Sequence, residues 1–279
     1  MGTLYIVATP IGNLGDITLR ALDVLRQVSL IAAEDTRTTR KLLSHYGICT
    51  PLVSYYEHNR LQREERVLST LADADVALAS ESGTPTISDP GYQLVRSVLQ
   101  HGHRVSPVPG PNAAIAAVAA SGMPTDAFTF VGFLPRQRNQ RQERLGELAW
   151  LRHTLVFYES PRRVPACLAD MLAVLGNRRC AVARELTKIH EEIWRGSLEE
   201  AVESFGRGPR GEFTLVIEGR TEQPWPRDQV EEALHRLRQE GWSPADAARQ
   251  VAVLSGWPRA EVYRLGLDTR EGQAVEELE

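Results

Sequence analysis

The sequence predicts an α/β protein of two α/β domains followed by a small all-helical C-terminal appendage. Short apolar, β-branched runs alternate with longer amphipathic segments through most of the chain, as expected for βαβ units and largely parallel sheets. A turn-rich stretch over 121–126 interrupts this alternation, and beyond residue 226 the pattern becomes wholly helical.

The predicted elements follow from hydrophobic periodicity. The predicted strands are 4–8, 30–33, 76–79, 128–133, 154–158, 181–184 and 214–217. The predicted helices between them include 18–27, 38–45, 60–71, 92–100 and 163–175, and small residues up to Ala120 form another. Thr36 is the expected N-cap of the second helix, and Gly47 stands where a left-handed terminus is needed.

Two breaks give the expected domain boundaries. We expect an N-terminal α/β domain over 1–121, a second α/β domain over 122–223 and a helical C-terminal module over 224–279. In the module, Pro244 suits the first turn of a helix. Two short helices around a turn resemble a helix-turn-helix in outline, but this region carries 7 Arg against 11 Asp and Glu. That balance favours a structural or interaction module over one that binds phosphates.

The composition indicates which kinds of partner, cysteine chemistry and cellular compartment to expect. The chain has 279 residues, 42% hydrophobic and 24% charged, with a net charge of −4 that argues against a generally basic nucleic-acid binder. Cys49, Cys167 and Cys180 are widely spaced and form no metal-ligand pattern, so we expect reduced thiols and no disulfide framework. The first residues lack the features of a signal peptide or membrane span, which predicts a cytoplasmic protein.

Three loops in the first half have the character of ligand-binding loops. The most informative is 80–91, where an apolar strand opens into hydroxyl residues, two glycines, two prolines and two carboxylates. Glycines let backbone approach a ligand, and open α/β folds bind ligands beyond the carboxyl ends of strands. The loops 8–18 and 107–114 are similar. The first could be only a tight strand-to-helix turn, and the small residues of the second could serve only close packing of a helix against the sheet. No dinucleotide or Walker-type phosphate motif is present.

The second half adds polar segments at strand ends. The segment 183–192 is densely charged directly after an apolar strand, and 157–163 ends another strand in polar residues. His190 has no Cys or His at ligand spacing, so no metal is expected. One strongly basic run, 133–144, contains Arg136, Arg138 and Arg141; it is either a solvated helix start or an arm that contacts phosphates.

Together these segments resemble the tetrapyrrole methylase superfamily of S-adenosylmethionine-dependent methyltransferases, and within it the branch that methylates small-subunit ribosomal RNA. The segments that carry the resemblance are 9–14, 33–37, 83–91, 109–111, 121–126, 132–135, 157–161, 184–188 and 195–196. They follow one another in order from residue 4 to about 219, so the match does not depend on a single pattern.

The resemblance implies a homodimer with the methyl donor in a cleft between the two α/β domains, and no membrane partner. The implied substrate is the 2′-hydroxyl of a cytidine in the decoding region of 16S ribosomal RNA, either as free RNA or in the assembled 30S subunit. The implied donor-binding residues are Pro10, Ser80, Glu81, Gly83, Thr84, Pro85, Ser88, Asp89, Ala113, Tyr158, Leu186 and Thr187. An alternative acceptor for the same fold is a porphyrinoid carbon or a protein residue. A non-enzymatic binding module is a rival of a different class.

The sequence departs from the family pattern at three positions. We expect Asp where Glu81 stands, Ser where Asn112 stands and His where Arg162 stands. The first two are mild changes in loops that bind largely through backbone, whereas the third puts a specific role for that position in doubt.

Charged residues of the segment after residue 183 are the candidates for catalysis. A ribose hydroxyl is weakly acidic, so a base, or a cation near the developing alkoxide, would assist methyl transfer. We expect Lys188 or Arg184 to position or polarise the ribose-phosphate and Glu185 to accept the proton. Glu159 and Asp89 are further candidates for the base. Arg136, Arg138 and Arg141 are the expected RNA contacts.

Overall fold

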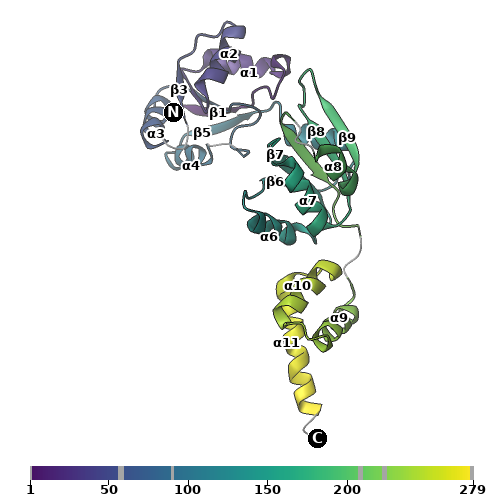
Figure 1. Ribbon diagram of the computed structural model, residues 1–279. Coiled ribbons are helices and arrows are strands. Elements are labelled where there is room, and N and C mark those ends of the chain that lie inside the picture. Colours follow the sequence, from purple (N-terminus) through teal and green to yellow (C-terminus); the bar gives the residue numbers. More distant parts are fainter. Residues whose placement is uncertain (1, 56–59, 89–90, 207–209, 222–224, 277–279) are drawn as a thin grey trace. The chain divides into compact units, whose positions relative to one another are not determined.

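The computed structural model describes residues 2–55, 60–88, 91–206, 210–221 and 225–276. Its contacts divide the chain into two compact units, shown in Figure 1. One contains Met1–Ala120 with Arg184–Glu192, and the other contains Ser121–Ala183 with Ile193–Glu279. The charged segment Arg184–Glu192 thus groups with the first unit, although the sequence pattern placed it in the second domain. The expected division into three domains stays a prediction.

The first unit contains a parallel sheet in the order β3-β2-β4-β1-β5. Its strands are β1 (Thr3–Val7), β2 (Leu30–Ala33), β3 (Leu52–Ser54), β4 (Val76–Ala79) and β5 (Arg104–Val108). The connecting helices are α1 (Leu19–Gln27), α2 (Thr36–His45), α3 (Arg60–Leu71) and α4 (Tyr92–Gln100), with a short 3-10 helix, η1 (Leu14–Asp16), and α5 (Ala113–Ser121) after β5.

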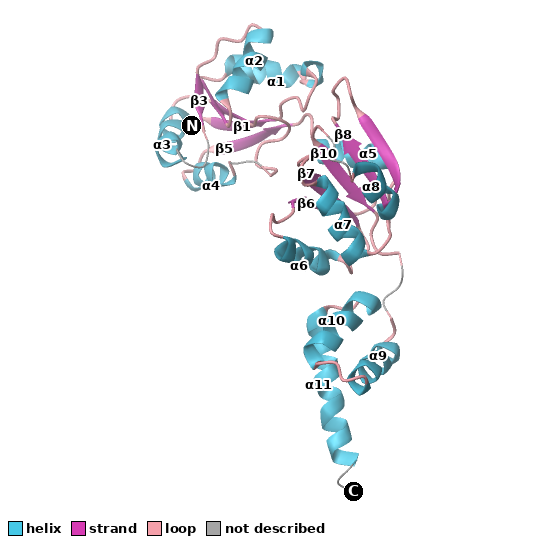
Figure 2. Ribbon diagram, viewed as in Figure 1, coloured by secondary structure: helices cyan, strands magenta, loops and turns pink. Residues whose placement is uncertain are grey.

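Alternation along the strands builds a core on each face of this sheet. Ile31 and Ala77 pack with residues of α1 and α2, while their neighbours Leu30 and Leu78 pack with residues of α3 and α4. Because successive side chains of a strand point to opposite faces, strands that are apolar at every position fit a sheet covered by helices on both sides. Figure 2 shows these helices around the sheet.

The second unit contains a mixed sheet in the order β6-β7-β10-β8-β9. Its elements are β6 (Phe128–Phe133), α6 (Arg138–Leu148), β7 (Thr154–Glu159), α7 (Val164–Leu175), β8 (Arg179–Arg184), β9 (Glu192–Ser197), α8 (Leu198–Phe205) and β10 (Phe213–Ile217). Helices α6, α7 and α8 contribute apolar side chains to one core with β7, β8 and β10. β6 pairs with β7 in parallel, but β10 pairs with β7 antiparallel, so the prediction of largely parallel sheets holds only for the first unit.

The C-terminal region of the second unit is helical, with α9 (Arg227–Gln239), α10 (Pro244–Ser255) and α11 (Arg259–Glu276) around their own small core. Ser243 caps α10 by accepting a hydrogen bond from the amide of Asp246, and Pro244 occupies the first helical turn as predicted. A left-handed Gly256 ends this helix.

The fold class is confirmed, and the differences are local. Five predicted elements, 30–33, 60–71, 76–79, 92–100 and 128–133, have the bounds found in the structure. β3, β5 and β9 and helix α8 were not predicted. Asp35, rather than Thr36, is the N-cap of α2, because its carboxylate accepts the amide of Arg37 at 2.7 Å. Gly47 is left-handed, with φ +63°, as predicted.

Candidate functional site

The loops after β1 and β4 are joined by main-chain hydrogen bonds. Thr9 and Gly83 exchange both amide-to-carbonyl bonds, at 2.8 and 3.0 Å, as an isolated antiparallel bridge. The buried hydroxyl of Ser80 donates to the carbonyl of Gly83 at 3.0 Å. Ser80 therefore fixes the conformation of its own loop, which is a structural role in addition to the predicted contact with a ligand.

The loop after β5 is tied to the same place. Thr84 donates to the carbonyl of Pro111 at 3.2 Å, and the amide of Asn112 donates to the Thr84 hydroxyl at 3.3 Å. A Cβ on Gly110 would lie 3.0 Å from the Cβ of Ala8, so glycine lets these two loops approach closely. The carboxyl ends of β1, β4 and β5 thus carry one connected group of loops.

The charged segment Arg184–Glu192 lies against the first of these loops. A Cβ on Gly12 would fall 2.5 Å from Cγ of Lys188 and 3.0 Å from both the carbonyl oxygen of Leu186 and Oγ1 of Thr187. Only a glycine leaves room for that approach. The segment with the predicted catalytic residues Arg184, Glu185 and Lys188 therefore lies in the first unit, together with the loops after β1, β4 and β5 that hold most of the residues predicted for donor binding.

Backbone strain is concentrated in two of these loops. Among the described residues, the four non-glycine residues with positive φ are Thr86 (74°), Ser88 (64°), Glu185 (50°) and Thr187 (67°). Positive φ is uncommon outside glycine, and for a β-branched threonine it is a genuine outlier. Such strain persists where surrounding structure fixes it, and it gathers at ligand-binding sites. This distribution supports a functional role for loops 80–88 and 184–192.

Two ion pairs and one hydrogen bond organise the charged segment. Nζ of Lys188 lies 2.9 Å from Oε1 of Glu185, and both side chains are largely covered. Arg184 lies 3.4 Å from Glu192, while the amide of Thr187 donates to Glu191 at 2.6 Å. The hydroxyl oxygen of Thr187 is buried and, among the described residues, has no hydrogen-bond partner. It is an open polar position inside this group of loops.

Glu81 lies close to another acidic residue, Glu34. Its amide approaches Oε2 of Glu34 at 3.5 Å, and Thr38 donates to its carboxylate at 3.4 Å. Burial, followed by the nearby negative charges of Glu81 and Asp35, raises the pKa of Glu34 despite the hydrogen bond from the Glu81 amide. Glu34 was not among the predicted site residues; its position directly after a buried strand was the available signal.

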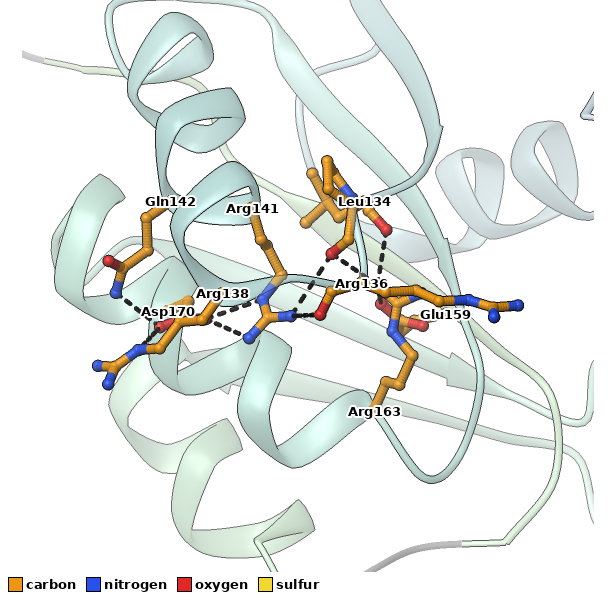
Figure 3. A network of polar contacts seen from close by, with 9 residues as sticks. Leu134, Arg136, Arg138, Arg141, Gln142, Glu159, Arg163 and Asp170 are labelled. Carbon is orange, nitrogen blue, oxygen red and sulfur yellow. Dashed lines mark hydrogen bonds and ion pairs between the residues drawn. The ribbon is translucent and has the colours of Figure 1, made fainter.

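The basic run after β6 divides into exposed and buried arginines, as Figure 3 shows. Arg141 is only 6% exposed, and its guanidinium donates to Asp170 at 2.5 and 2.8 Å and to the carbonyl of Arg136 at 3.1 Å. Arg138 is largely exposed and reaches Asp170 at 3.2 Å. In Figure 3 the Arg136 guanidinium points away from this network. The geometry assigns Arg141 a structural role, and of the three predicted RNA contacts Arg136 and Arg138 are exposed.

Arg163 and Glu159 form an ion pair next to this network. The carboxylate of Glu159 is buried, 3.1 Å from Nη2 of Arg163, and accepts the amide of Ser160 at 2.8 Å. Arg163 also donates to the carbonyls of Leu134 and Pro135, at 2.6 and 3.2 Å. Glu159, one of the candidate bases, is thus committed to a buried ion pair.

The remaining predicted residues have varied positions. Pro10 and Leu186 are half-buried in the first unit, Pro85 is buried, and Ala113 begins α5. Tyr158 belongs to the second unit, where its ring contacts those of Phe130 and Phe133 at 5.0 and 5.8 Å. Asp89 lies outside the described residues. The close approach of Gly12 to the charged segment and the bridge between Thr9 and Gly83 were not predicted, although Thr9 and Gly12 both lie in segment 9–14, which carries the family resemblance.

The described residues contain no cluster of three or more His, Cys, Asp or Glu side chains that could hold a metal ion. No described helix is both long and apolar enough to cross a membrane.

Comparisons with known proteins extend over most of the chain. A family model described as Tetrapyrrole (Corrin/Porphyrin) Methylases matches residues 3–202. A ribosomal RNA small subunit methyltransferase I from Halalkalibacterium halodurans is 47% identical over 272 residues, covering 95% of this chain and 94% of that protein. The protein of the same name from Bacillus subtilis is 43% identical, covering 94% and 93%. That from Thermotoga maritima is 48% identical over 222 residues, covering 79% of this chain and 100% of that protein.

Solved structures share the fold at much lower identity. A diphthine synthase aligns with a TM-score of 0.61 at 10% identity, covering 79% of this chain and 91% of that chain. A cobalt precorrin-4 methyltransferase aligns with a TM-score of 0.57 at 18% identity, covering 77% and 94%. At these identities the likeness concerns the fold alone.

Proposed function

The chain belongs to the tetrapyrrole (corrin/porphyrin) methylase family, and on this basis we propose that it is an S-adenosylmethionine-dependent methyltransferase of small-subunit ribosomal RNA. The observation that carries the proposal is the similarity to ribosomal RNA small subunit methyltransferases I, at 43 to 47% identity over 94 to 95% of the chain. The acceptor is the 2′-hydroxyl of a cytidine in the decoding region. The enzyme acts in the cytoplasm as a homodimer.

The loops of the first unit fit S-adenosylmethionine. The donor is a cationic molecule with hydroxyl, amino and carboxylate groups, which suits loops rich in backbone amides, hydroxyls and carboxylates. The unpartnered hydroxyl of Thr187 and the close approach at Gly12 support this assignment. The residues that hold the donor are Pro10, Ser80, Glu81, Gly83, Thr84, Pro85, Ser88, Asp89, Ala113, Tyr158, Leu186 and Thr187.

The donor supplies an electrophilic methyl group when bound. The chain must then align the ribose hydroxyl, keep water out and assist loss of its proton. Glu185 accepts that proton, and Lys188 stabilises the developing negative charge on the ribose oxygen. Arg184, half-buried beside Glu192, positions the adjoining phosphate. Arg136 and Arg138 contact further phosphates of the RNA.

Mapping of 2′-O-methylation on ribosomal RNA tests the proposal. RNA from cells with and without this protein would be compared at every nucleotide of the small-subunit RNA. We expect one cytidine of the decoding region to lose its 2′-O-methyl group without the protein. An unchanged map, or methyl transfer by the purified chain only to a porphyrinoid or a protein, would refute the proposed acceptor.

Donor binding and substrate form need separate measurements. Titration calorimetry with S-adenosylmethionine distinguishes an enzyme from a binding module, because a module of another kind would show no heat of binding. Purified free RNA and purified 30S subunits, each tested as methyl acceptors, would reveal which form is the substrate.

A further inference from the structure

The loop after β6 presents an exposed aromatic ring beside exposed cations. Phe133, the last residue of β6, is 56% exposed, and its ring meets that of Tyr158 edge-on at 5.8 Å. Arg136 and Arg138 follow within five residues, and both are exposed. The run 136–144 contains four Arg and one Glu in a chain of net charge −4, so this loop is a local basic region.

One buried arginine, Arg141, and one half-buried arginine, Arg163, fix the backbone of this loop. Arg141 donates to the carbonyl of Arg136 at 3.1 Å, and Arg163 donates to those of Leu134 and Pro135 at 2.6 and 3.2 Å. Figure 3 shows the two guanidinium groups and the carbonyls of Leu134 and Arg136 that they approach. Three consecutive carbonyl oxygens are therefore held by two side chains.

The ion pairs beneath the loop are unusual because they are buried. Asp170 holds Arg141, and Glu159 holds Arg163; both carboxylates are 3% exposed. Apolar side chains of similar volume often stabilise a core as well as a buried ion pair does. What two arginines add here is a fixed backbone for Phe133 and Arg136. Preorganising a binding loop lowers the conformational entropy lost when a partner binds.

We propose that the loop 133–138 binds an unpaired nucleotide of the RNA substrate. Phe133 stacks on the base, Arg136 pairs with the neighbouring phosphate, and Arg141 and Arg163 are positioning residues. This inference rests on the proposed function, because it names how that RNA is recognised. An exposed aromatic ring followed closely in sequence by exposed arginines is the chemistry that binds unstacked bases, whereas bases within a helix are not accessible to such a ring.

Binding of the full-length chain to small-subunit ribosomal RNA and to single-stranded oligocytidylate tests the proposal. We expect Phe133→Ala to weaken both by about 5- to 100-fold, while Phe133→Tyr retains most of the affinity. Phe128→Ala is the matched control, because Phe128 is 38% exposed at the other end of the same strand. It should leave both affinities unchanged.

Salt dependence separates stacking from charge. Arg136→Gln should reduce the slope of log affinity against log salt by about 0.7, the single-strand value for one phosphate contact. Phe133→Ala should weaken binding at every salt concentration without changing that slope. The positioning role is tested by Arg163→Gln, which should raise KM for RNA while kcat and the affinity for S-adenosylmethionine stay the same. Arg144→Gln, at an exposed pair with Glu147, is its control.

The outcomes separate this inference from the proposed function. If the wild-type chain methylates ribosomal RNA but Phe133→Ala behaves like Phe128→Ala, the inference is wrong and the function stands. If the wild-type chain methylates no RNA, the proposed function is wrong. In that case, equal affinities of Phe133→Ala and Phe128→Ala for oligocytidylate would show that the inference is wrong as well. Phe133→Ala could instead dissociate a dimer without affecting RNA affinity. That result would identify this ring as part of a contact between two copies of the chain and would overturn the proposal.

Discussion

Nζ of Lys188 lies 2.9 Å from Oε1 of Glu185, three residues earlier in the same loop. Glu185 has a positive φ of 50°. Their side chains are 29% and 20% exposed, so neither charge is fully hydrated. The pair brings a cation and a carboxylate to the same point beside Gly12. That arrangement suits a reaction in which a hydroxyl loses a proton while negative charge develops on its oxygen.

Lys188→Ala and Glu185→Gln should each lower kcat for RNA methylation by about 100-fold or more, the range typical of general acid–base groups. The affinity for S-adenosylmethionine, measured by calorimetry, should change little. Lys41→Ala is the matched control, because Lys41 is exposed on α2 and is the other lysine of the chain. Wild-type turnover in both of the first two variants would require another catalytic pair.

Thr187→Val tests whether the buried hydroxyl contacts the donor. Valine keeps the branched shape but removes the oxygen that has no partner among the described residues. Without donor, the free energy of unfolding should be unchanged or rise by about 1 kcal/mol, because a buried unsatisfied hydroxyl is destabilising. The affinity for S-adenosylmethionine should fall by about 2- to 10-fold, as expected for one lost hydrogen bond.

The two readouts of Thr187→Val distinguish ligand contact from packing. A lower stability in the absence of donor, together with unchanged donor affinity, would mean that the hydroxyl serves the protein itself. Thr70→Val, at an exposed hydroxyl that bonds the carbonyl of Arg66, is a control remote from these loops in sequence.

Asp170→Asn should destabilise the protein by about 3–5 kcal/mol at neutral pH, since it leaves the buried charge of Arg141 without its counterion. Burial alone would raise the pKa of Asp170, but hydrogen bonds from Arg141, Gln142 and Arg138 lower it below its ordinary value. A carboxyl with a lowered folded-state pKa stabilises the fold above its unfolded pKa and loses that contribution as pH falls through the folded pKa.

The difference in unfolding free energy between wild type and Asp170→Asn should therefore be full at neutral pH and shrink below about pH 4. Urea unfolding at a series of pH values measures it. Asp246→Asn, which removes an exposed partner of Arg249, should cost at most about 1 kcal/mol. A wild-type advantage that persists unchanged in acid would show that the Asp170 effect is not ionic.

Much of the fold could be predicted from the sequence because its strands are strongly apolar. β2 and β4 are buried at every position, so the pattern 30–33 and 76–79 identified them without error in their bounds. β3 has three residues, β5 includes Pro107, and β9 is half exposed, so none shows a continuous apolar run. The antiparallel pairing of β10 is a property of topology, which local periodicity does not encode.

The candidate site was predicted as a set of loops but not as a set of contacts. Gly, Pro and hydroxyl residues at strand ends indicate loops that can approach a ligand, and the structure brings four of them together in one unit. The sequence could not distinguish Arg141 from Arg136, because the buried partner Asp170 is 29 residues away on α7. Long-range partners of this kind decide whether an arginine binds a substrate or its own protein.

Gly12→Ala tests whether the approach of the charged segment to the loop after β1 is needed for donor binding. The new methyl group would lie 3.0 Å from the backbone oxygen of Leu186 and 2.5 Å from Cγ of Lys188, so the segment must shift. Overpacking of this size typically lowers the free energy of unfolding by about 1–3 kcal/mol. A shift of Thr187 would misplace a proposed contact to the donor, and a shift of Lys188 would misplace a proposed catalytic group. We expect donor affinity and kcat to fall together, each by about tenfold or more. Gly146→Ala, in α6, where an added Cβ would meet no described atom within 4 Å outside its own helix, should instead stabilise the protein by about 0.5–1 kcal/mol and leave activity unchanged. Normal donor affinity in Gly12→Ala would show that the two loops move independently and that the donor does not depend on their contact.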